Sequence, residues 1–511
     1  MAIAEQTVHP DGRVELTDPD AVANSPYGNA ELAPTRLPER NWTTYNYAAL
    51  WMGMALNIPS YLLAAGLVQL GMNWLQAFLV ITVGNLVVLV PMLLNSHAGT
   101  KYGIPFPVFA RAFYGIRGAN LPALLRAFIA CGWFGIQTWV GGQAIYVIVG
   151  KLAGDGWTNA SAIGGHAWTL WLSFTFFWVL QMLLIWRGIE ALRSFENWAA
   201  PLVLVGFLAL MVWIVAEAGG LGPILDQPSQ LGWGAAFWKL AAPSLMGMIA
   251  FWATLSLNMP DFTRFGGSQK QQAIGQALGL PTTMSLIAIL SIITTSGTIV
   301  VYGEAIWDPV VLAARFENPV VVVIGLVIAI LATMTTNVAA NVVSPSYDFS
   351  NAVPKLLTYR TAGLVTGVLG ILIQPWRLIS DPSIYIFTWL GFYGGLLASV
   401  AGVLIAGYWL VERTHLSLAD LYQPGGRYWF SAGWNWRGVV ATVVGSLLAV
   451  GGAYSNPGAG PFPADGLIPF LKPLYDYSWA VGLVVGFVTY LVLAKTASAR
   501  QRNTAHAAPM F

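Results

Sequence analysis

Long apolar stretches recur along this chain and are separated by short polar segments. Each stretch extends over roughly 17 to 25 residues, the length that an α-helix needs to cross the hydrocarbon core of a bilayer. The stretches begin near Tyr45, Trp74, Leu121, Trp168, Trp198, Trp238, Ala277, Pro319, Ala362, Ser383, Gly438 and Ser478. This pattern predicts an all-α polytopic membrane protein with twelve transmembrane helices.

The composition agrees with a chain embedded in lipid. Of the 511 residues, 56% are hydrophobic and only 9% are charged, and the mean hydropathy is +0.64. Soluble domains carry about 25% charged residues, so that class is excluded.

The distribution of positive charge orients the helices. If the N-terminus is cytoplasmic, the only Lys and Arg residues outside, of 24 in the chain, are Lys151, Lys239, Arg315, Arg377 and Lys472. Cytoplasmic loops of membrane proteins are enriched in Lys and Arg. We therefore expect a multi-pass protein of the plasma (inner) membrane with both termini in the cytoplasm.

The two ends of the chain differ from the apolar region. Residues 1–40 are polar, contain scattered prolines and lack the apolar segment of a signal peptide, so we expect a disordered cytoplasmic tail. Residues 497–511 are expected to form a second such tail. The basic loop after Ser96 is rich in Gly and Pro, and predicts a short amphipathic helix on the cytoplasmic face.

The first apolar stretch contains the sequence LNIPSY, from Leu56 to Tyr61. Pro59 lacks a backbone N–H and displaces the carbonyl of residue 55, so carbonyls between Gly53 and Leu56 lose their helical partners. In lipid each such group needs another partner within the protein. Two interpretations remain open, a tolerated proline kink and an unwound segment that lines a binding cavity.

A similar sequence, LNMPDF, runs from Leu257 to Phe262. Repetition of a motif in this way is typical of transporters built from two inverted five-helix repeats, in which the first helix of each repeat is interrupted. Because Asp261 and Arg264 place LNMPDF at the membrane surface, we expect the corresponding interruption earlier in the sixth span, around Met248 to Trp252.

Two spans carry polar groups within apolar sequence. The eighth span contains Thr335, Thr336, Asn337 and Asn341, and the spacing of four places the two asparagines on one face. In the third span, Trp133 and Gln137 also share a face. An indole beside a carboxamide suits a planar amide or imide, although polar packing between helices is the alternative in both spans.

Several motifs together resemble the nucleobase:cation symporter-1 family, which includes hydantoin, allantoin and uracil transporters. The motifs are LNIPSY, HAGTKYGIPFPV, RAFYGIRGANLPALLRA, GWFGIQTW, NMPDFTRF, TTNVAANVVSPSYD and LVERTHLSLADLY. The resemblance implies a LeuT-type fold, with an inverted repeat of five plus five helices and two further helices. It divides the membrane region into residues 41–235 and 236–411 for the repeats, and 412–496 for an inner loop and the last two helices.

The resemblance also implies a substrate site. Trp133 and Trp252 would sandwich the substrate ring, and Gln137 and Asn341 would pair with its polar edge. Phe251 replaces a glycine of the hydantoin transporter. The complete set of implied substrate-binding residues is Asn57, Trp133, Gln137, Phe251, Trp252, Asn337 and Asn341.

A sodium site is implied in the same way, by matching positions in spans one and eight. Its members are Gly53, Leu56, Ala332, Thr335 and Thr336. Carbonyl and hydroxyl oxygens without charge suit a hard cation such as Na⁺. Some relatives are proton-coupled, but no Asp, Glu or His lies at the middle of spans one, three, six or eight, which favours sodium. Gly407 stands where many relatives have Asp, so an inner ion pair of the family is absent at that position.

These features lead to an expected function. We expect secondary active import of a neutral planar heterocycle, such as allantoin, hydantoin or uracil, by alternating access together with a cation. Sodium is the expected coupling ion, and no cofactor is expected. A proton-coupled purine or pyrimidine permease and a passive channel are the alternatives. No HExxH motif or Cys and His cluster indicates an enzyme. The expected partners are the small heterocycle and the lipid bilayer, without nucleic acid.

Overall fold

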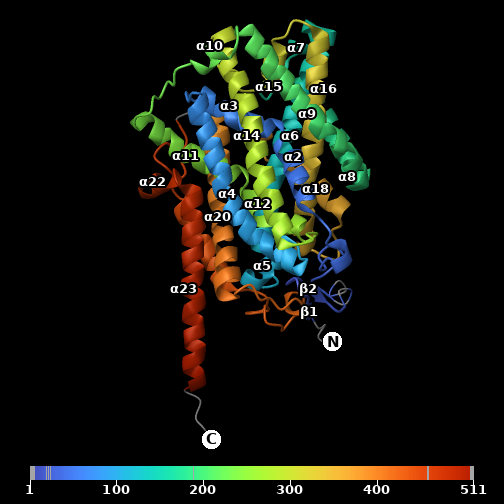
Figure 1. The fold of residues 1–511 in the computed structure, drawn as a ribbon, viewed down its shortest axis with the longest axis vertical. Coiled ribbons are helices and arrows are strands. Elements are labelled where there is room, and N and C mark those ends of the chain that lie inside the picture. The colour runs from blue at the N-terminus through green and yellow to red at the C-terminus, as the bar shows by residue number, and fades with distance from the viewer. Residues whose placement is uncertain are drawn as a thin grey trace.

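The computed structural model describes most of the chain. The described residues are 6–18, 20, 22, 25–187, 189–456 and 460–506, without the side chains of 189–200, 335, 339, 359 and 497–506. The strands of this part form two small antiparallel hairpins, β1 (Gln6–Val8) with β2 (Val14–Leu16) and β3 (Ala162–Ile163) with β4 (His166–Ala167). All other regular structure described is helical, and both ends of the chain lie at the same end of the molecule, which we call the terminal end (Figure 1).

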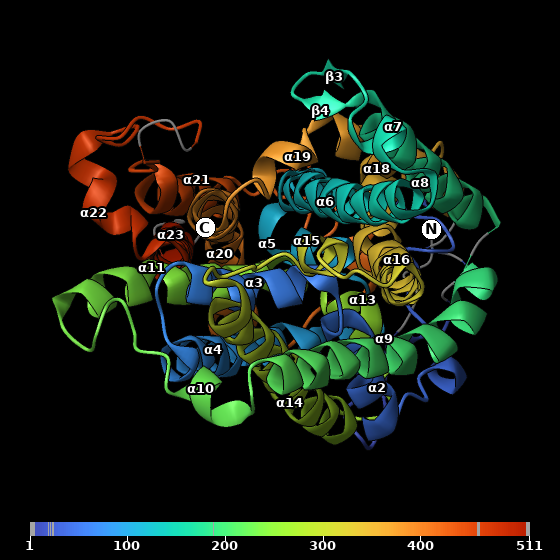
Figure 2. The same ribbon diagram turned by 90° about the horizontal axis from the view of Figure 1, so that it is seen from above.

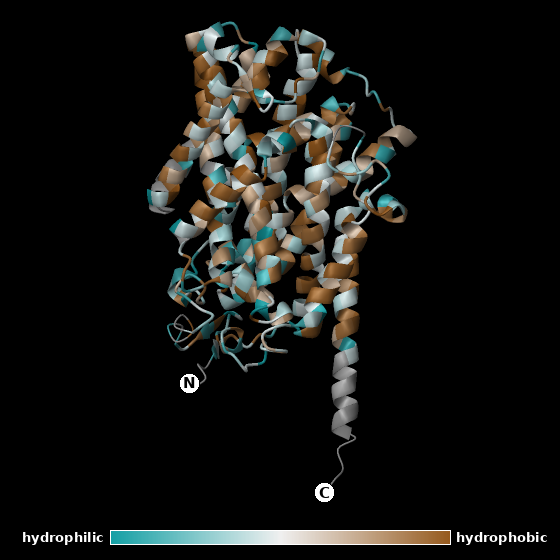
Figure 3. Cartoon of the chain, turned by 180° about the vertical axis from the view of Figure 1, so that it is seen from behind, coloured by the Kyte–Doolittle hydropathy of each residue, from teal (hydrophilic) through white to brown (hydrophobic). Residues whose placement is uncertain are grey.

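Helices stand at each of the twelve predicted positions. In chain order the spans are α2 (Thr44–Ala55) with α3 (Ile58–Gln69), α4 (Trp74–Tyr102), α6 (Asn120–Ala153), α8 (Trp168–Arg187), α9 (Ile189–Glu217), α11 (Ala235–Phe251) with α12 (Ala253–Asn258), α14 (Gln269–Tyr302), α16 (Pro319–Asn341) with α17 (Val343–Ala352), α18 (Tyr359–Leu372), η2 (Ile384–Leu390) with α20 (Gly391–Ile405) and η3 (Ala406–Val411), α21 (Trp436–Val450) and α23 (Ser478–His506). By length and composition, 7 are able to cross a membrane, or 8 if α2 and α3 form one span, and the others are shorter apolar helices or continue one. Apolar residues dominate their length (Figure 3).

Short helices fill the connections. They are η1 (Leu37–Glu39), α5 (Phe106–Tyr114), α7 (Asp155–Thr158), α10 (Leu221–Leu225), α13 (Pro260–Thr263), α15 (Pro309–Ala314), α19 (Pro375–Leu378), η4 (Ala419–Leu421), η5 (Pro469–Leu471) and α22 (Lys472–Tyr475). Local sequence sets many boundaries. Asn73 and Gln76 form a capping box at the start of α4, and Gly103 ends that helix in the left-handed conformation.

Two groups of helices meet at the centre of the molecule. In the first, α14 packs on α2, α3 and α4, and α4 packs on α11 and α12. We call spans one, two, six and seven the bundle group. In the second, α6 packs on α8, α16, α17 and α18, and we call these helices the scaffold group. Viewed from above, α6, α8 and α18 lie on one side and α2, α4 and α14 on the other (Figure 2).

Three spans are interrupted. The axes of α2 and α3 differ by 61° at the break around Asn57. In the sixth span α11 ends at Phe251 and Trp252 leads into α12, so the interruption lies where the sequence predicts it. The helix of the eighth span is also interrupted at Val342, between α16 and α17, where φ is −119°, which the sequence analysis does not anticipate.

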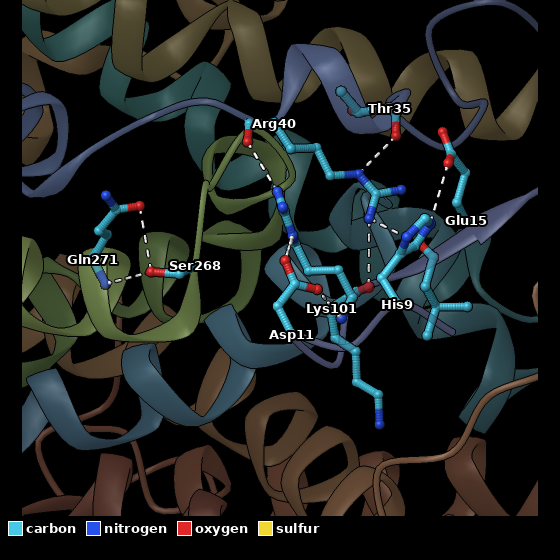
Figure 4. Close-up of polar contacts among 10 residues, drawn as sticks. His9, Asp11, Glu15, Thr35, Arg40, Lys101, Ser268 and Gln271 are labelled. Carbon is cyan, nitrogen blue, oxygen red and sulfur yellow. Dashed lines mark hydrogen bonds and ion pairs between the residues drawn. The ribbon is translucent and has the colours of Figure 1, made fainter. Parts of the chain in front are cut away.

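The N-terminal region differs from the predicted disordered tail. Val14 and Leu32 are buried, and the buried Arg40 donates to the carbonyl oxygens of Thr35 and Val14. Figure 4 shows Arg40 directed at Thr35. Arg264 donates to Thr35 Oγ1 and to further carbonyls of the same segment. Composition alone missed this order, because the segment is held by guanidinium groups rather than by an apolar helix face.

Two other predictions at the terminal end need correction. All nine residues of α5 are buried, so this helix is no amphipathic surface helix. Its Arg111 donates to Asn351 Oδ1 and to the carbonyls of Tyr27 and Leu421, which explains how a guanidinium is accommodated there. The predicted C-terminal tail is helical as far as His506, and residues 507–511 lie outside the described residues.

Candidate binding site at the helix breaks

The break in span one releases backbone carbonyls. Pro59 has no N–H to offer Ala55, and the carbonyl of Ala55 instead accepts from the N–H of Asn57. In a continuous helix that N–H would bond to Gly53. The carbonyl of Gly53 is thereby freed, and the carbonyl of Leu56 is freed in turn because the N–H of Ser60 bonds to Asn57 Oδ1.

Asn57 stabilises the break itself. Its Oδ1 caps α3 by accepting from the N–H of Ser60, and its Nδ2 donates to the carbonyl of Met54. The sequence predicts a substrate contact for this residue. In the structure one donor and one acceptor of the carboxamide are already used within span one, so Asn57 acts first as a capping residue.

The freed Gly53 carbonyl faces span eight. The hydroxyl of Thr336 on α16 donates to it over 3.3 Å. Ala332 is buried on the same helix, one turn earlier. The side chain of Thr335 lies outside the described part of the structure. Gly53, Leu56 and Thr336 therefore provide uncharged oxygens between the bundle and scaffold groups, a donor set that fits Na⁺.

Trp252 occupies the break in span six. Its Nε1 donates to Asn85 Oδ1 on α4 over 3.1 Å, and its ring meets that of Trp51 at 90° with centroids 5.1 Å apart. Asn85 is itself fixed by donating to the carbonyl of Ile81 on its own helix. The orientation of the Trp252 indole is thus set by α2 and α4.

Trp133 faces this break from α6. Its Nε1 donates to the hydroxyl of Tyr393 on α20 over 3.1 Å. Phe251 touches both tryptophans, with its ring centroid 5.2 Å from Trp133 and 4.8 Å from Trp252. The edge-on angles, 78° and 89°, are typical of favourable aromatic pairs. The two predicted stacking residues therefore flank one aromatic side chain.

Gln137 lies one turn along α6 from Trp133 and is 4% exposed. Its Oε1 is buried and accepts no hydrogen bond from any residue that the structure describes. An unpaired buried acceptor costs about 1–3 kcal/mol. Such a group is a good partner for an N–H donor of a ligand.

The two asparagines of span eight have different roles. Asn337 Nδ2 donates to Gln181 Oε1 on α8 over 2.7 Å and to the carbonyl of Phe134, while its Oδ1 accepts from Asn341 Nδ2 over 2.9 Å. The carboxamide of Asn337 is thus satisfied by protein groups, in contrast to the substrate contact that the sequence predicts. Asn337 instead orients Asn341, whose Oδ1 forms no hydrogen bond within the described residues.

The structure gathers most of the predicted residues and adds others. Phe251 of the sixth span contacts both its neighbour Trp252 and Trp133 of the third span, and Gln137 lies one turn from Trp133 on α6. The residues that fix their orientation, Asn85, Tyr393 and Gln181, were missed. Asn85 and Gln181 could have been found from the sequence, because each is a polar residue inside an apolar span.

Comparison with known proteins decides the family. A family model described as permease for cytosine/purines, uracil, thiamine, allantoin matches residues 35–482. The chain belongs to this permease family. The permease is therefore a multi-pass membrane transport protein and not an enzyme, as the sequence indicates.

Individual relatives agree with this assignment. Over 476 residues the permease is 43% identical to the allantoin permease of Bacillus subtilis (strain 168), covering 91% of this chain and 93% of the relative. It is 37% identical over 470 residues to the purine-uracil permease NCS1 of Arabidopsis thaliana, covering 91% and 78%.

A solved structure establishes the fold. The permease matches MHP1, a nucleobase-cation-symport-1 family transporter, in a closed conformation with bromovinylhydantoin bound. The TM-score is 0.73 with 26% identity, over 93% of this chain and 96% of that chain. The predicted resemblance and LeuT-type fold are confirmed.

Loss of the Asn85 side-chain oxygen tests how Trp252 is positioned. We expect Asn85→Leu to weaken substrate binding about 3- to 10-fold, because the indole loses a buried hydrogen bond. Binding titration of the purified permease measures this. Asn95→Leu is the matched control, since Asn95 also lies buried on α4 but donates to the carbonyl of Ser256. Equal losses in both variants would contradict a specific role for Asn85.

Proposed function

We propose that the permease imports a neutral planar heterocycle, such as allantoin, hydantoin or uracil, together with sodium by alternating access. The observation that carries this proposal is the uncharged polar face of Gln137 and Asn341 beside two indoles. A neutral ureide or imide offers N–H groups to the two carboxamide oxygens and a flat ring to the aromatic side chains.

The cation is proposed to bind between spans one and eight. Gly53 and Leu56 would contribute carbonyl oxygens, and Thr336 its hydroxyl, with Ala332 and Thr335 added by family resemblance. A cation held there connects the bundle group to the scaffold group. Its binding can therefore bias the permease toward one arrangement of the two groups.

The proposed orientation places the terminal end in the cytoplasm. The terminal end carries both termini, and the basic residues Arg40, Arg111 and Arg264 donate to carbonyl oxygens of the N-terminal segment. This placement follows the enrichment of Lys and Arg in cytoplasmic loops.

Uptake into proteoliposomes tests the substrate class. Hydantoins, allantoin, uracil, cytosine and purines are offered as competitors of a labelled ureide, with sodium or choline outside. We expect neutral ureides and imides to compete best, because the site has no carboxylate for the amino group of cytosine or adenine. Replacing sodium by choline should reduce uptake, and undiminished uptake would contradict sodium coupling. Failure to accumulate substrate against its gradient would indicate a passive channel.

A further inference from the structure

A second polar cluster lies buried between the binding site and the terminal end. Arg126 on α6 pairs with Asp348 on α17, with 3.1 Å between Nη1 and Oδ2 and side-chain exposures of 1% and 0%. Asp261 on α13 is buried beside them and lies within the electrostatic influence of Arg126. Two carboxyl groups thus share one guanidinium.

The hydrogen bonds of the cluster are incomplete. Asp261 Oδ1 accepts from the N–H of Phe106 over 2.8 Å, and Asp261 Oδ2 lies 3.3 Å from Asn258 Nδ2, which also contacts Ser344 Oγ at 2.6 Å. Two acceptors, Asn258 Oδ1 and Asp348 Oδ1, and one donor, Arg126 Nε, are buried without a partner in the described part of the chain. Buried polar atoms are rarely left unpaired, and two acceptors against one donor leave the cluster short of one donor.

Among the residues that the structure describes, no other cation neutralises the second carboxyl group. Arg111 on α5 is bound to Asn351 and to carbonyls, and Arg264, after α13, is bound to the N-terminal segment. Cys131 on α6 and Tyr347 on α17 are neutral acids. His97, Lys101 and Tyr102 on α4 are not among the groups that act electrostatically on Asp261, whereas Arg126 is. Two ionised carboxylates with one guanidinium would leave a net negative charge in the protein interior, which is strongly unfavourable.

A proton resolves both problems. We assign the proton to Asp261 because Asp348 is bonded directly to Arg126, and burial raises the pKa of Asp261 above its ordinary value. A hydroxyl at Asp261 Oδ2 supplies a donor.

We propose that Asp261, Arg126 and Asp348 form a proton-binding site, with one proton held on Asp261 in this arrangement of the helices. Asn258 is the last residue of span six, in the bundle group, and Asp261 lies just after it on α13. Arg126, Ser344 and Asp348 belong to the scaffold group. This inference rests on the proposed alternating access. When the bundle and scaffold groups separate at the terminal end, Asp261 would be exposed to water and would release the proton. The site thereby makes closure at the terminal end depend on pH.

The sign of this dependence is fixed. A carboxyl group whose pKa is higher in the closed arrangement than in the open one stabilises the closed arrangement at low pH. This stabilisation is lost as the pH rises through the raised pKa. One proton changes the equilibrium between closed and open arrangements by up to about tenfold per pH unit.

Infrared spectroscopy of the purified permease detects the proton directly, through the carbonyl stretch of a protonated carboxylic acid. We expect the wild-type spectrum near neutral pH to contain a band that is lost in Asp261→Asn and also in Asp348→Asn, where Arg126 is free to pair with an ionised Asp261. Glu304→Gln is the control, because Glu304 is 57% exposed and pairs with Arg315 at the surface, so the band should remain. Identical spectra for the wild type and both aspartate variants would overturn the proposal.

Transport provides a second measurement. Uptake by the wild type should change with pH on the side of the terminal end, and Asp261→Asn should remove this dependence while size-exclusion chromatography shows a folded protein. A wild type that has the band but takes up no heterocycle would refute the proposed function and leave the proton site standing. Normal uptake with the same pH profile in wild type and Asp261→Asn would refute the proton site alone.

Discussion

Replacing Gln137 by leucine is expected to weaken binding of the heterocycle about 10- to 100-fold and, at the same time, to raise the thermal stability of the substrate-free permease. The two effects have one cause. Gln137 Oε1 is buried without a protein donor, so it destabilises the empty site and becomes satisfied only when a ligand donates to it. Leucine fills a similar volume and removes the unpaired oxygen.

Gln181→Leu is the matched control for this prediction. Gln181 is equally buried, but its Oε1 accepts from Asn337 and its Nε2 donates to Thr138 Oγ1 over 2.9 Å. Its loss leaves partners unpaired and should lower the melting temperature. Thermal unfolding and a binding titration on both variants measure the predicted changes in stability and affinity. A destabilised Gln137→Leu with unchanged affinity would show that Gln137 is a packing residue.

The second large effect is expected for the cation. Thr336→Val should remove most of the sodium stimulation of uptake and raise the sodium concentration for half-maximal uptake roughly tenfold or more, because the proposed cage loses a hydroxyl oxygen. The same change removes the 3.3 Å hydrogen bond to the Gly53 carbonyl, so the contact between spans one and eight weakens as well.

Thr333→Val separates the cation effect from a general effect of the substitution. Thr333 lies on the same helix and is buried, but its hydroxyl donates to the carbonyl of Ala329 one turn earlier and forms no hydrogen bond with span one among the described residues. Sodium dependence is measured as uptake at a series of sodium concentrations with choline as the balancing ion. Equal sodium dependence of Thr336→Val and the wild type would remove Thr336 from the proposed site.

The sequence predicted features that depend on neighbouring residues. Pro59 lacks a donor wherever it stands in a helix, so the break in span one and its freed carbonyls followed from local chemistry. The position of Trp133 relative to Gln137 followed from helix periodicity. Both features are present in the structure.

Features that depend on distant partners were beyond this reasoning. The bond between Asn85 and Trp252 joins residues from two spans, and no spacing rule relates them. Asn337 and Asn341 are the same residue type and lie on the same face of α16. The hydrogen bond of Asn337 to Gln181 on α8 nevertheless gives Asn337 a different role. The buried pairing of Arg126 with Asp348 likewise appears only when α6 and α17 are packed together.

The ordered N-terminal segment has a consequence for the speed of transport. The carbonyl of Glu31 accepts from Arg264, which follows the bundle group, while the carboxylate of Glu31 accepts from Ser350 Oγ of the scaffold group. Any movement that parts the two groups at this end must break one of these bonds or carry the segment with one group. Under the proposed alternating access, residues of this segment would therefore contribute to the activation barrier between states, and sequence changes there would alter turnover without altering affinity for the substrate.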